Sequence, residues 1–371
     1  MKKTRMLLAG ALSIMLALTL AGCGGGSSSP KTNGDTIYVL GPTPDHGWTA
    51  QAGTFAQARV DEINKEGKYK AQYMASSTGD AQNDIVQTII ANGDAAGVVF
   101  MALDDSAKSG QEALISAGIP FISFDRIIEG PDKSAILNFS GDNWAVGAGI
   151  AYWLQKNGMQ PGDTLITLIG DNGTVSSRRQ EGFEQFLLGT RDYTDKSGAT
   201  YKTSQTWTQD QINTLTATYK VVCNWSADTA YQYLEQSLPD IINSGISNLY
   251  VFSMDDEMTF GFMNLLQGNT LSDADKSTLA NMNVSISAIG GMQELYDVMT
   301  GKSDLSPVAD QYFDNLMSMY FSPQMMTTAI NYMIQYLDGS SWTFKQGDGA
   351  YEPTFIVDKT NAGSTQGFTG H

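Results

Sequence analysis

Short apolar stretches alternate with longer amphipathic segments along the first part of the chain. The apolar stretches have the length of buried strands, and the amphipathic segments repeat their apolar residues at helical spacing. The strands are expected at 36–41, 70–77, 95–102 and 119–125, and the helices at 48–65, 81–93 and 108–118. This alternation with short loops is the signature of a doubly wound parallel sheet.

A second series of the same kind starts near Asp142. Its helices are expected at 143–158, 177–189, 227–245 and 256–268, and its strands at 163–170, 219–223, 248–254 and 284–291. The remaining residues are too few for a third domain, so we expect them to complete the two lobes. The predicted fold is α/β, with two doubly wound parallel-sheet lobes joined by a three-strand hinge. The N-terminal lobe is predicted to comprise 35–140 plus 312–345, and the C-terminal lobe 141–311 plus 346–371.

The first residues have the pattern of an export signal. Three cations precede the apolar run 6–20, which is too short to span a bilayer and has the length of a secretory core. The run ends in LAGC, which resembles the lipobox of bacterial lipoproteins and implies cleavage before Cys23 and lipid on its thiol. We therefore predict a signal peptide over 1–22 and a flexible GGGSSS-containing tether over 23–34. An ordinary signal peptide with an incidental cysteine is the alternative.

Composition narrows the chemistry. The formal charge of −17 argues against partners such as nucleic acid and anionic lipid. Cys23 and Cys223 are the two cysteines, so an acylated Cys23 leaves no disulfide within the chain. We expect no metal and no cofactor. Cys223 itself either touches a ligand or is a small buried thiol.

Polar and aromatic residues gather where the predicted strands end. Carboxylates and guanidinium groups hold vicinal hydroxyls, and indole faces pack on the C–H face of a sugar ring. Because ligands of open α/β sheets bind beyond the carboxyl ends of the strands, these residues predict a site for a neutral polyol such as a monosaccharide. The stretches concerned are PDHGW (44–48), LDD (103–105), FDR (124–126), GDNGTVSSRR (170–179), CNW (223–225), SMDDEM (253–258) and IGGMQ (289–293). Each has a simpler interpretation, as a core tryptophan, a surface ion pair or the acidic first turn of a helix.

Enzyme motifs are missing from the sequence. It contains no nucleophile elbow, zinc-protease motif, phosphate-binding loop or dinucleotide fingerprint. A carboxylate pair such as Asp125 with Asp255 leaves a secreted glycoside hydrolase open. However, Arg126 beside Asp125 lowers the pKa that a general acid needs raised. We therefore predict that the protein is not an enzyme.

The chain resembles the ribose/galactose-type sugar-binding proteins, the type I substrate-binding lipoproteins of bacterial ABC importers. The resemblance covers 35–357 and rests on IPFISFDR (119–126), SGDNWAVGAGIA (140–151), SSRRQEGF (176–183) and VFSMDDEMTFGFMNLL (251–266). It implies no catalytic residues, and a ligand site made of His46, Trp48, Asp125, Arg126, Arg179, Trp225, Asp255 and Gln311.

The resemblance also assigns roles and shows two departures. Trp48 and Trp225 are expected to sandwich the sugar, and His46, the only internal histidine, is expected to hold a hydroxyl as a neutral group. The third predicted strand ends in Met101-Ala102-Leu103-Asp104, where the family often has Asn-Pro followed by an acid. Gly290-Gly291 stands where the family commonly has a hydrogen-bonding aspartate.

The implied function is capture of a monosaccharide by hinge closure and its delivery to an ABC permease. The protein is expected to be a monomer outside the cytoplasm, held by the lipid on Cys23 to the outer face of the cell membrane. A receptor of the same fold that senses a sugar or an autoinducer is the alternative, and a secreted glycoside hydrolase is a third.

Overall fold

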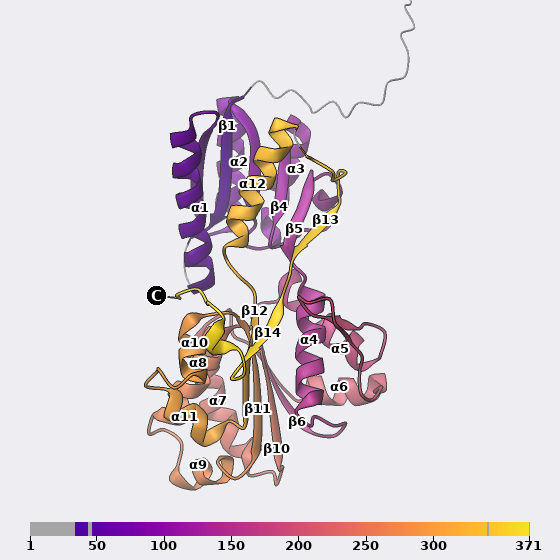
Figure 1. Cartoon of the computed structure of the whole chain (residues 1–371), viewed down its shortest axis with the longest axis vertical. Coiled ribbons are helices and arrows are strands. Elements are labelled where there is room, and N and C mark those ends of the chain that lie inside the picture. Colours follow the sequence, from indigo (N-terminus) through magenta and orange to yellow (C-terminus); the bar gives the residue numbers. More distant parts are fainter. Residues whose placement is uncertain (1–33, 44–46, 340, 371) are drawn as a thin grey trace, which may run out of the picture. The chain divides into compact units, whose positions relative to one another are not determined.

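The computed structural model describes residues 34–43, 47–339 and 341–370. Two six-stranded sheets, each covered by helices on both faces, make up this part of the chain (Figure 1). The predicted signal peptide, Cys23, nearly all of the predicted tether and His46 lie outside the described residues. None of the helices in the described part combines the length and apolar character that crossing a membrane requires.

The first sheet belongs to the N-terminal lobe and is parallel throughout. Its strand order is β13-β5-β4-β3-β1-β2. The strands are β1 (Thr36–Pro42), β2 (Lys70–Ser76), β3 (Ala95–Met101), β4 (Phe121–Phe124), β5 (Leu137–Gly141) and β13 (Gly349–Glu352). Every residue of β1 and β3 is buried, as expected for the centre of a sheet covered on both faces.

The second sheet belongs to the C-terminal lobe, and its strand order is β14-β12-β11-β10-β6-β9. The strands are β6 (Thr164–Ile169), β9 (Tyr219–Val222), β10 (Asn248–Ser253), β11 (Asn283–Gly290), β12 (Asn315–Tyr320) and β14 (Phe355–Asp358). Only the edge strand β14 runs antiparallel to its neighbour. A small hairpin of β7 (Tyr193–Thr194) and β8 (Thr200–Tyr201) lies outside both sheets.

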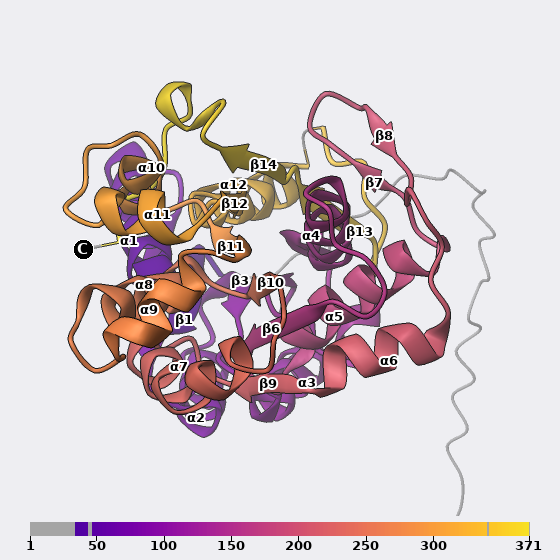
Figure 2. The ribbon, with the colours of Figure 1, turned by 90° about the horizontal axis from the view of Figure 1, so that it is seen from below.

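Helices cover both faces of each sheet. In the first lobe, α1 and α12 pack together on one face, and α2 and α3 pack together on the other (Figure 1). In the second lobe, α4, α5 and α6 lie on one side of the sheet and α7 to α11 on the other (Figure 2). The first-lobe helices are α1 (Gly47–Glu66), α2 (Gly79–Asn92), α3 (Lys108–Ala117) and α12 (Met325–Asp338). The second-lobe helices are α4 (Asn143–Lys156), α5 (Thr174–Leu187), α6 (Gln209–Ala217), α7 (Ala227–Ile242), α8 (Asp256–Gln267), α9 (Asp273–Leu279), α10 (Gln293–Met299) and α11 (Ser306–Tyr312).

The described chain passes between the lobes three times, but two of these crossings differ from the prediction. The first follows β5, as predicted, and leads into α4. The second follows β12. The prediction placed 312–345 in the first lobe, but β12 belongs to the sheet of the second lobe. The third lies between β13 and β14. The prediction placed all of 346–371 in the second lobe, but β13 pairs with β5 and so belongs to the sheet of the first lobe.

Helices α4 and α5 approach each other closely through two glycines. A Cβ on Gly147 of α4 would lie 1.9 Å from the carbonyl oxygen of Arg179, and one on Gly182 of α5 would lie 2.1 Å from that of Trp144. Neither helix can take a side chain at these positions without moving its neighbour. This contact fixes α5, the helix that carries Arg179, against α4, which follows the first crossing.

Gly182→Ala should therefore destabilise the protein by about 1–3 kcal/mol, the usual cost of overpacking a well-packed contact. The measurement is the free energy of unfolding in urea. Gly363→Ala is the matched control, since an added Cβ there meets only Thr300 Cγ2 at 3.8 Å, and it should change the value by less than about 0.5 kcal/mol. Equal effects of the two substitutions would contradict the close helix contact.

Candidate functional site

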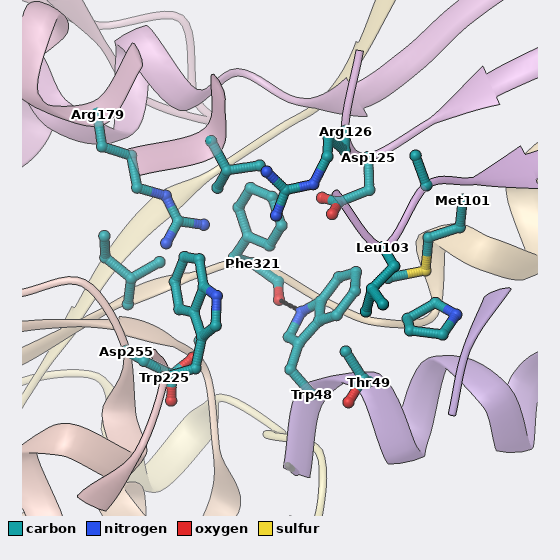
Figure 3. Close-up of a pocket in the computed structure, with 15 residues that line it drawn as sticks. Trp48, Thr49, Met101, Leu103, Asp125, Arg126, Arg179, Trp225, Asp255 and Phe321 are labelled. Carbon is teal, nitrogen blue, oxygen red and sulfur yellow. Dashed lines mark hydrogen bonds between the residues drawn. The ribbon is translucent and has the colours of Figure 1, made fainter. Parts of the chain in front are cut away.

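A cavity lies where the carboxyl ends of the strands of both sheets meet. Its volume, counted as the space open to the centres of water molecules, is about 90 Å³. One water needs roughly 10–15 Å³ on this measure, so the cavity has room for a small ligand. The lining residues come from both lobes and from the second crossing. They are Pro42, Trp48, Thr49, Met101, Ala102, Leu103, Asp125, Arg126, Val175, Arg179, Trp225, Asp255, Ile289, Gly290 and Phe321 (Figure 3).

Trp48 and Phe321 join the first lobe to the second crossing at the cavity. The indole Nε1 of Trp48 donates a hydrogen bond of 2.7 Å to the carbonyl oxygen of Phe321, and their rings lie 5.7 Å apart between centroids. Because Trp48 is 7% exposed and its N–H is already bonded, it offers a ligand only its ring face. Gly141, at the end of β5, leaves room for the Phe321 ring, which a Cβ there would meet at 2.0 Å.

Trp225 enters the cavity from the second lobe through an unusual backbone. Asn224 and Trp225 both have left-handed conformations, with φ of 49° and 62°. For a bulky residue such a conformation costs of order 1–3 kcal/mol and tends to occur at functional sites. The turn is held by hydrogen bonds from Cys223 N to Ile169 O at 2.7 Å and from Trp225 N to Gly170 O at 3.2 Å. Trp225 is thereby directed into the cavity across from Trp48 (Figure 3).

Asp125 is the first polar residue after β4 and also has a left-handed backbone, with φ of 60°. Its N–H donates to Phe139 O at 2.9 Å, which anchors the turn to β5. Burial raises the pKa of the carboxyl, and the nearby charges of Arg126 and Arg179 oppose that rise. The carboxylate lines the cavity beside the Arg126 guanidinium (Figure 3).

Arg126 pairs with Asp171 across the two lobes. Its NH2 nitrogen lies 2.6 Å from Asp171 Oδ2. Burial raises the pKa of Asp171, but the charge and hydrogen bond of Arg126 outweigh burial and hold that pKa below its ordinary value. The other two guanidinium nitrogens, Nε and NH1, are buried without a hydrogen-bond partner among the described residues. Buried donors of this kind are normally satisfied, so the arginine has capacity for a ligand.

Arg179 is held rigidly by the second lobe. Its Nε donates to Asn143 Oδ1 at 2.9 Å and its NH1 to Met254 O at 2.7 Å. The guanidinium lies 5.6 Å from the ring centroid of Trp225 and 5.1 Å from that of Phe321, both within the range of cation–π attraction. Burial lowers the pKa of Arg179 to about 10, so the side chain is still charged at neutral pH.

Asp255 and Asp256 are adjacent but have separate surroundings. Asp255 lines the cavity and caps α8, accepting from Glu257 N at 2.8 Å, and burial raises its pKa well above the usual value. Asp256 turns away from the cavity and accepts from Gly291 N and Met292 N, each at 2.8 Å, and from the Ser318 hydroxyl. Burial raises the pKa of Asp256 to about 6.

Six of the predicted ligand residues come together at the cavity. They are Trp48, Asp125, Arg126, Arg179, Trp225 and Asp255. Gln311 does not join them: it is exposed on α11, because the chain forms that helix and then β12 before it crosses between the lobes. The crossing residue at the cavity is Phe321, which the sequence analysis missed. His46 lies outside the described residues.

The structure also bears on the role of Cys223 and on metal binding. Cys223 is fully buried and does not line the cavity, and burial raises the pKa of its thiol to about 12. Within the described ranges, no three histidine, cysteine or acidic side chains gather in a way that could hold a metal ion.

A family model for the periplasmic binding protein domain matches residues 37–341. The chain belongs to the periplasmic binding protein family. The predicted family and fold are thus confirmed, and family membership implies an extracytoplasmic location. Since members are binding proteins, the prediction that the chain is not an enzyme is also confirmed, and the hydrolase alternative is set aside. No match to the chain was found among curated proteins.

Solved structures share this fold over most of the chain. The periplasmic component of the arabinose ABC transporter from Shewanella sp. ANA-3, bound to α- and β-L-arabinofuranose, is 16% identical with a TM-score of 0.65, over 89% of this chain and 93% of that one. The Caulobacter myo-inositol binding protein is 16% identical with a TM-score of 0.62, over 90% and 96%. A carbohydrate transporter solute binding protein from Chloroflexus aurantiacus, in complex with D-glucose, is 17% identical with a TM-score of 0.63, over 88% and 93%.

The raised pKa of Asp256 predicts a pH dependence of stability. Between about pH 4 and pH 6 the folded protein still holds this proton while the unfolded chain has released it, so the contribution to stability falls as pH rises through that window. Relative to Asp256→Asn, which has no such proton, the wild type should lose at most about 3 kcal/mol of unfolding free energy. Urea unfolding of both proteins from pH 4 to pH 7 measures this. Parallel curves would contradict it.

Proposed function

We propose that the protein captures a monosaccharide in the cavity by closure of its two lobes and delivers it to an ABC permease. The carrying observation is the set of charged and aromatic groups around one small cavity: two carboxylates, two arginines and two indoles from opposite lobes. Carboxylates accept from sugar hydroxyls, guanidinium groups donate to sugar oxygens, and indole faces pack on ring C–H groups. Arg126 Nε and NH1 supply donors that the described residues leave without a partner. The sugar-bound relatives support the same ligand class.

Contacts between the lobes support closure as the mechanism. Besides the Arg126–Asp171 pair, Gly47 N of α1 donates to Glu257 Oε1 of α8 at 2.5 Å. Arg178 NH2 of α5 also donates to Ile127 O at 3.4 Å. These contacts require the lobes to be close together. In a closed state they would hold the lobes around the sugar and create the surface that a permease recognises.

Lipid attachment at Cys23 would hold the protein at the outer face of the cell membrane. This part of the proposal rests on the LAGC sequence and the glycine- and serine-rich segment behind it. We propose that the anchored protein acts as a monomer. A sensing receptor of the same fold would use the same cavity and would differ in the membrane protein that it meets.

Calorimetric titration of the purified protein with pentoses, hexoses and deoxysugars should identify a ligand with a dissociation constant in the micromolar range or below. Trp225→Ala removes one aromatic wall and should weaken that ligand at least tenfold, while Trp225→Phe should retain much of the affinity. Trp342→Ala is the control, because Trp342 packs against Tyr336 and Phe344 outside the cavity. A protein that binds nothing in the panel contradicts the proposed function.

Asp171→Asn should weaken the same sugar about 10- to 100-fold, because the buried arginine then opposes closure without its charged partner. The loss is smaller than for a fully buried pair, which costs about 3–5 kcal/mol, since the Asp171 side chain is 21% exposed. Small-angle scattering should show a smaller ligand-induced decrease in the radius of gyration than in the wild type. The control Asp192→Asn changes a carboxylate whose contact with Lys202 is long, 3.8 Å, and exposed. If Asp171→Asn closes and binds like the wild type, the pair has no part in closure.

A further inference from the structure

We propose that the cavity selects a deoxysugar, whose deoxy carbon faces an apolar wall formed by Pro42, Met101, Ala102 and Leu103. This inference rests on the proposed function and adds the class of sugar. The wall comes from the ends of β1 and β3 in the first lobe. Where a deoxysugar has hydrogen or methyl, the parent sugar has a hydroxyl or a hydroxymethyl group, and the side chains of these four residues cannot bond its hydroxyl.

The charged groups of the cavity are unevenly distributed. Met101 and Leu103 lie on the opposite side from Arg179 and Asp255 (Figure 3). Asp125 lies closer to the wall, but its carboxylate points toward Arg126 and away from Met101 (Figure 3). A sugar held through its hydroxyls by the charged groups therefore turns another part of its ring or its exocyclic carbon toward the apolar wall. Thr49 lines the cavity below Leu103, but its hydroxyl points away from Leu103 and Met101 (Figure 3).

The backbone of the wall is occupied by a buried glutamine. Gln82 of α2 is fully buried, and its Nε2 donates to Met101 O at 2.9 Å while its Oε1 accepts from Leu103 N at 2.9 Å. The N–H of Leu103 is thus already used. Pro42, at the end of β1, has no N–H to donate. The wall therefore offers a ligand carbon atoms in place of donors.

The nearest acid at this strand end is also occupied. Asp104 is exposed and accepts from Ser106 N at 2.8 Å and from Ser106 Oγ at 2.5 Å, capping the short 3₁₀ turn Asp105–Ala107. Its carboxylate does not line the cavity. Neither the backbone nor the acid of this segment would satisfy a sugar hydroxyl at the wall.

The size of the preference for a deoxysugar depends on the cost of burying the parent sugar's extra hydroxyl without a partner. An apolar pocket discriminates against a ligand that adds a single hydroxyl by up to roughly 100-fold, because it provides no partner for the group. We expect the deoxysugar to bind about 10- to 100-fold more tightly than its parent. A larger ratio would need a group that actively repels the hydroxyl.

Calorimetry of the purified protein with matched pairs tests this inference. The pairs are D-fucose with D-galactose, L-rhamnose with L-mannose, and 2-deoxy-D-ribose with D-ribose. The expected result is that the tightest ligand is a deoxysugar, with its parent about 10- to 100-fold weaker. If sugars bind but the parent is equal or tighter in every binding pair, the inference is wrong and the proposed function stands. If none of the six and no other monosaccharide binds, both fail.

Variants at the wall connect the preference to its cause. Leu103→Asn places an amide at the wall and should reduce the preference to about threefold or less, or reverse it, because the parent hydroxyl gains a partner. Leu103→Met keeps an apolar side chain and should keep the preference. Ile115→Asn is the surface control, since Ile115 is 38% exposed on α3 and lies outside the cavity. An unchanged preference in Leu103→Asn would show that the apolar wall does not set it.

Discussion

The ion pair between Arg126 and Asp171 is the interaction on which the site depends. It joins the second residue after β4 in one lobe to the second residue after β6 in the other, with 2.6 Å between NH2 and Oδ2. Arginine stays charged under all physiological conditions, so a carboxylate partner and further acceptors reduce the cost of burying it. Asp171 supplies the first, and a sugar in the cavity could supply the others to Nε and NH1. Closure of the lobes and completion of the binding site are then one event.

Backbone geometry at the strand ends directs the side chains that surround this pair. Asp125, Asn224 and Trp225 all have left-handed conformations that are unfavourable for residues other than glycine. Each lies within three residues of the end of a strand, and hydrogen bonds to the neighbouring strand or its end hold the turn in place. Glycines opposite them allow the close contacts: a Cβ on Gly170 would lie 2.2 Å from the Trp225 ring, and one on Gly173 would lie 2.0 Å from Arg126 NH1. The local strain is thus concentrated where the ligand groups are presented.

The sequence predicted the parts of this site that depend on local pattern. Buried strands are recognisable from their apolar runs, and a polar or aromatic residue just after each one falls at the cavity, as Trp48, Asp125 and Trp225 do. The failures concern non-local pairing. β13 is four residues long and is defined by its pairing with β5, over 200 positions earlier, which no local pattern encodes. The same limit explains why Gln311 was placed at the crossing that Phe321 occupies.

Asp256 explains why Gly290 occupies a position where the resemblance leads us to expect a hydrogen-bonding aspartate. A Cβ on Gly290 would lie 2.8 Å from Asp256 Oδ2, and the backbone there has a φ of 153° that side chains rarely adopt. Asp256 bonds the next two N–H groups and the Ser318 hydroxyl, so it fixes the end of β11 against β12. A carboxylate at position 290 could not coexist with this arrangement. Asp256 therefore lies behind the end of β11, where it supports the lining of the cavity at Gly290 without itself lining the cavity. Gly290 provides no side-chain partner for a hydroxyl, and neither do the apolar ends of β1 and β3, so both features favour a ligand with fewer hydroxyls to satisfy.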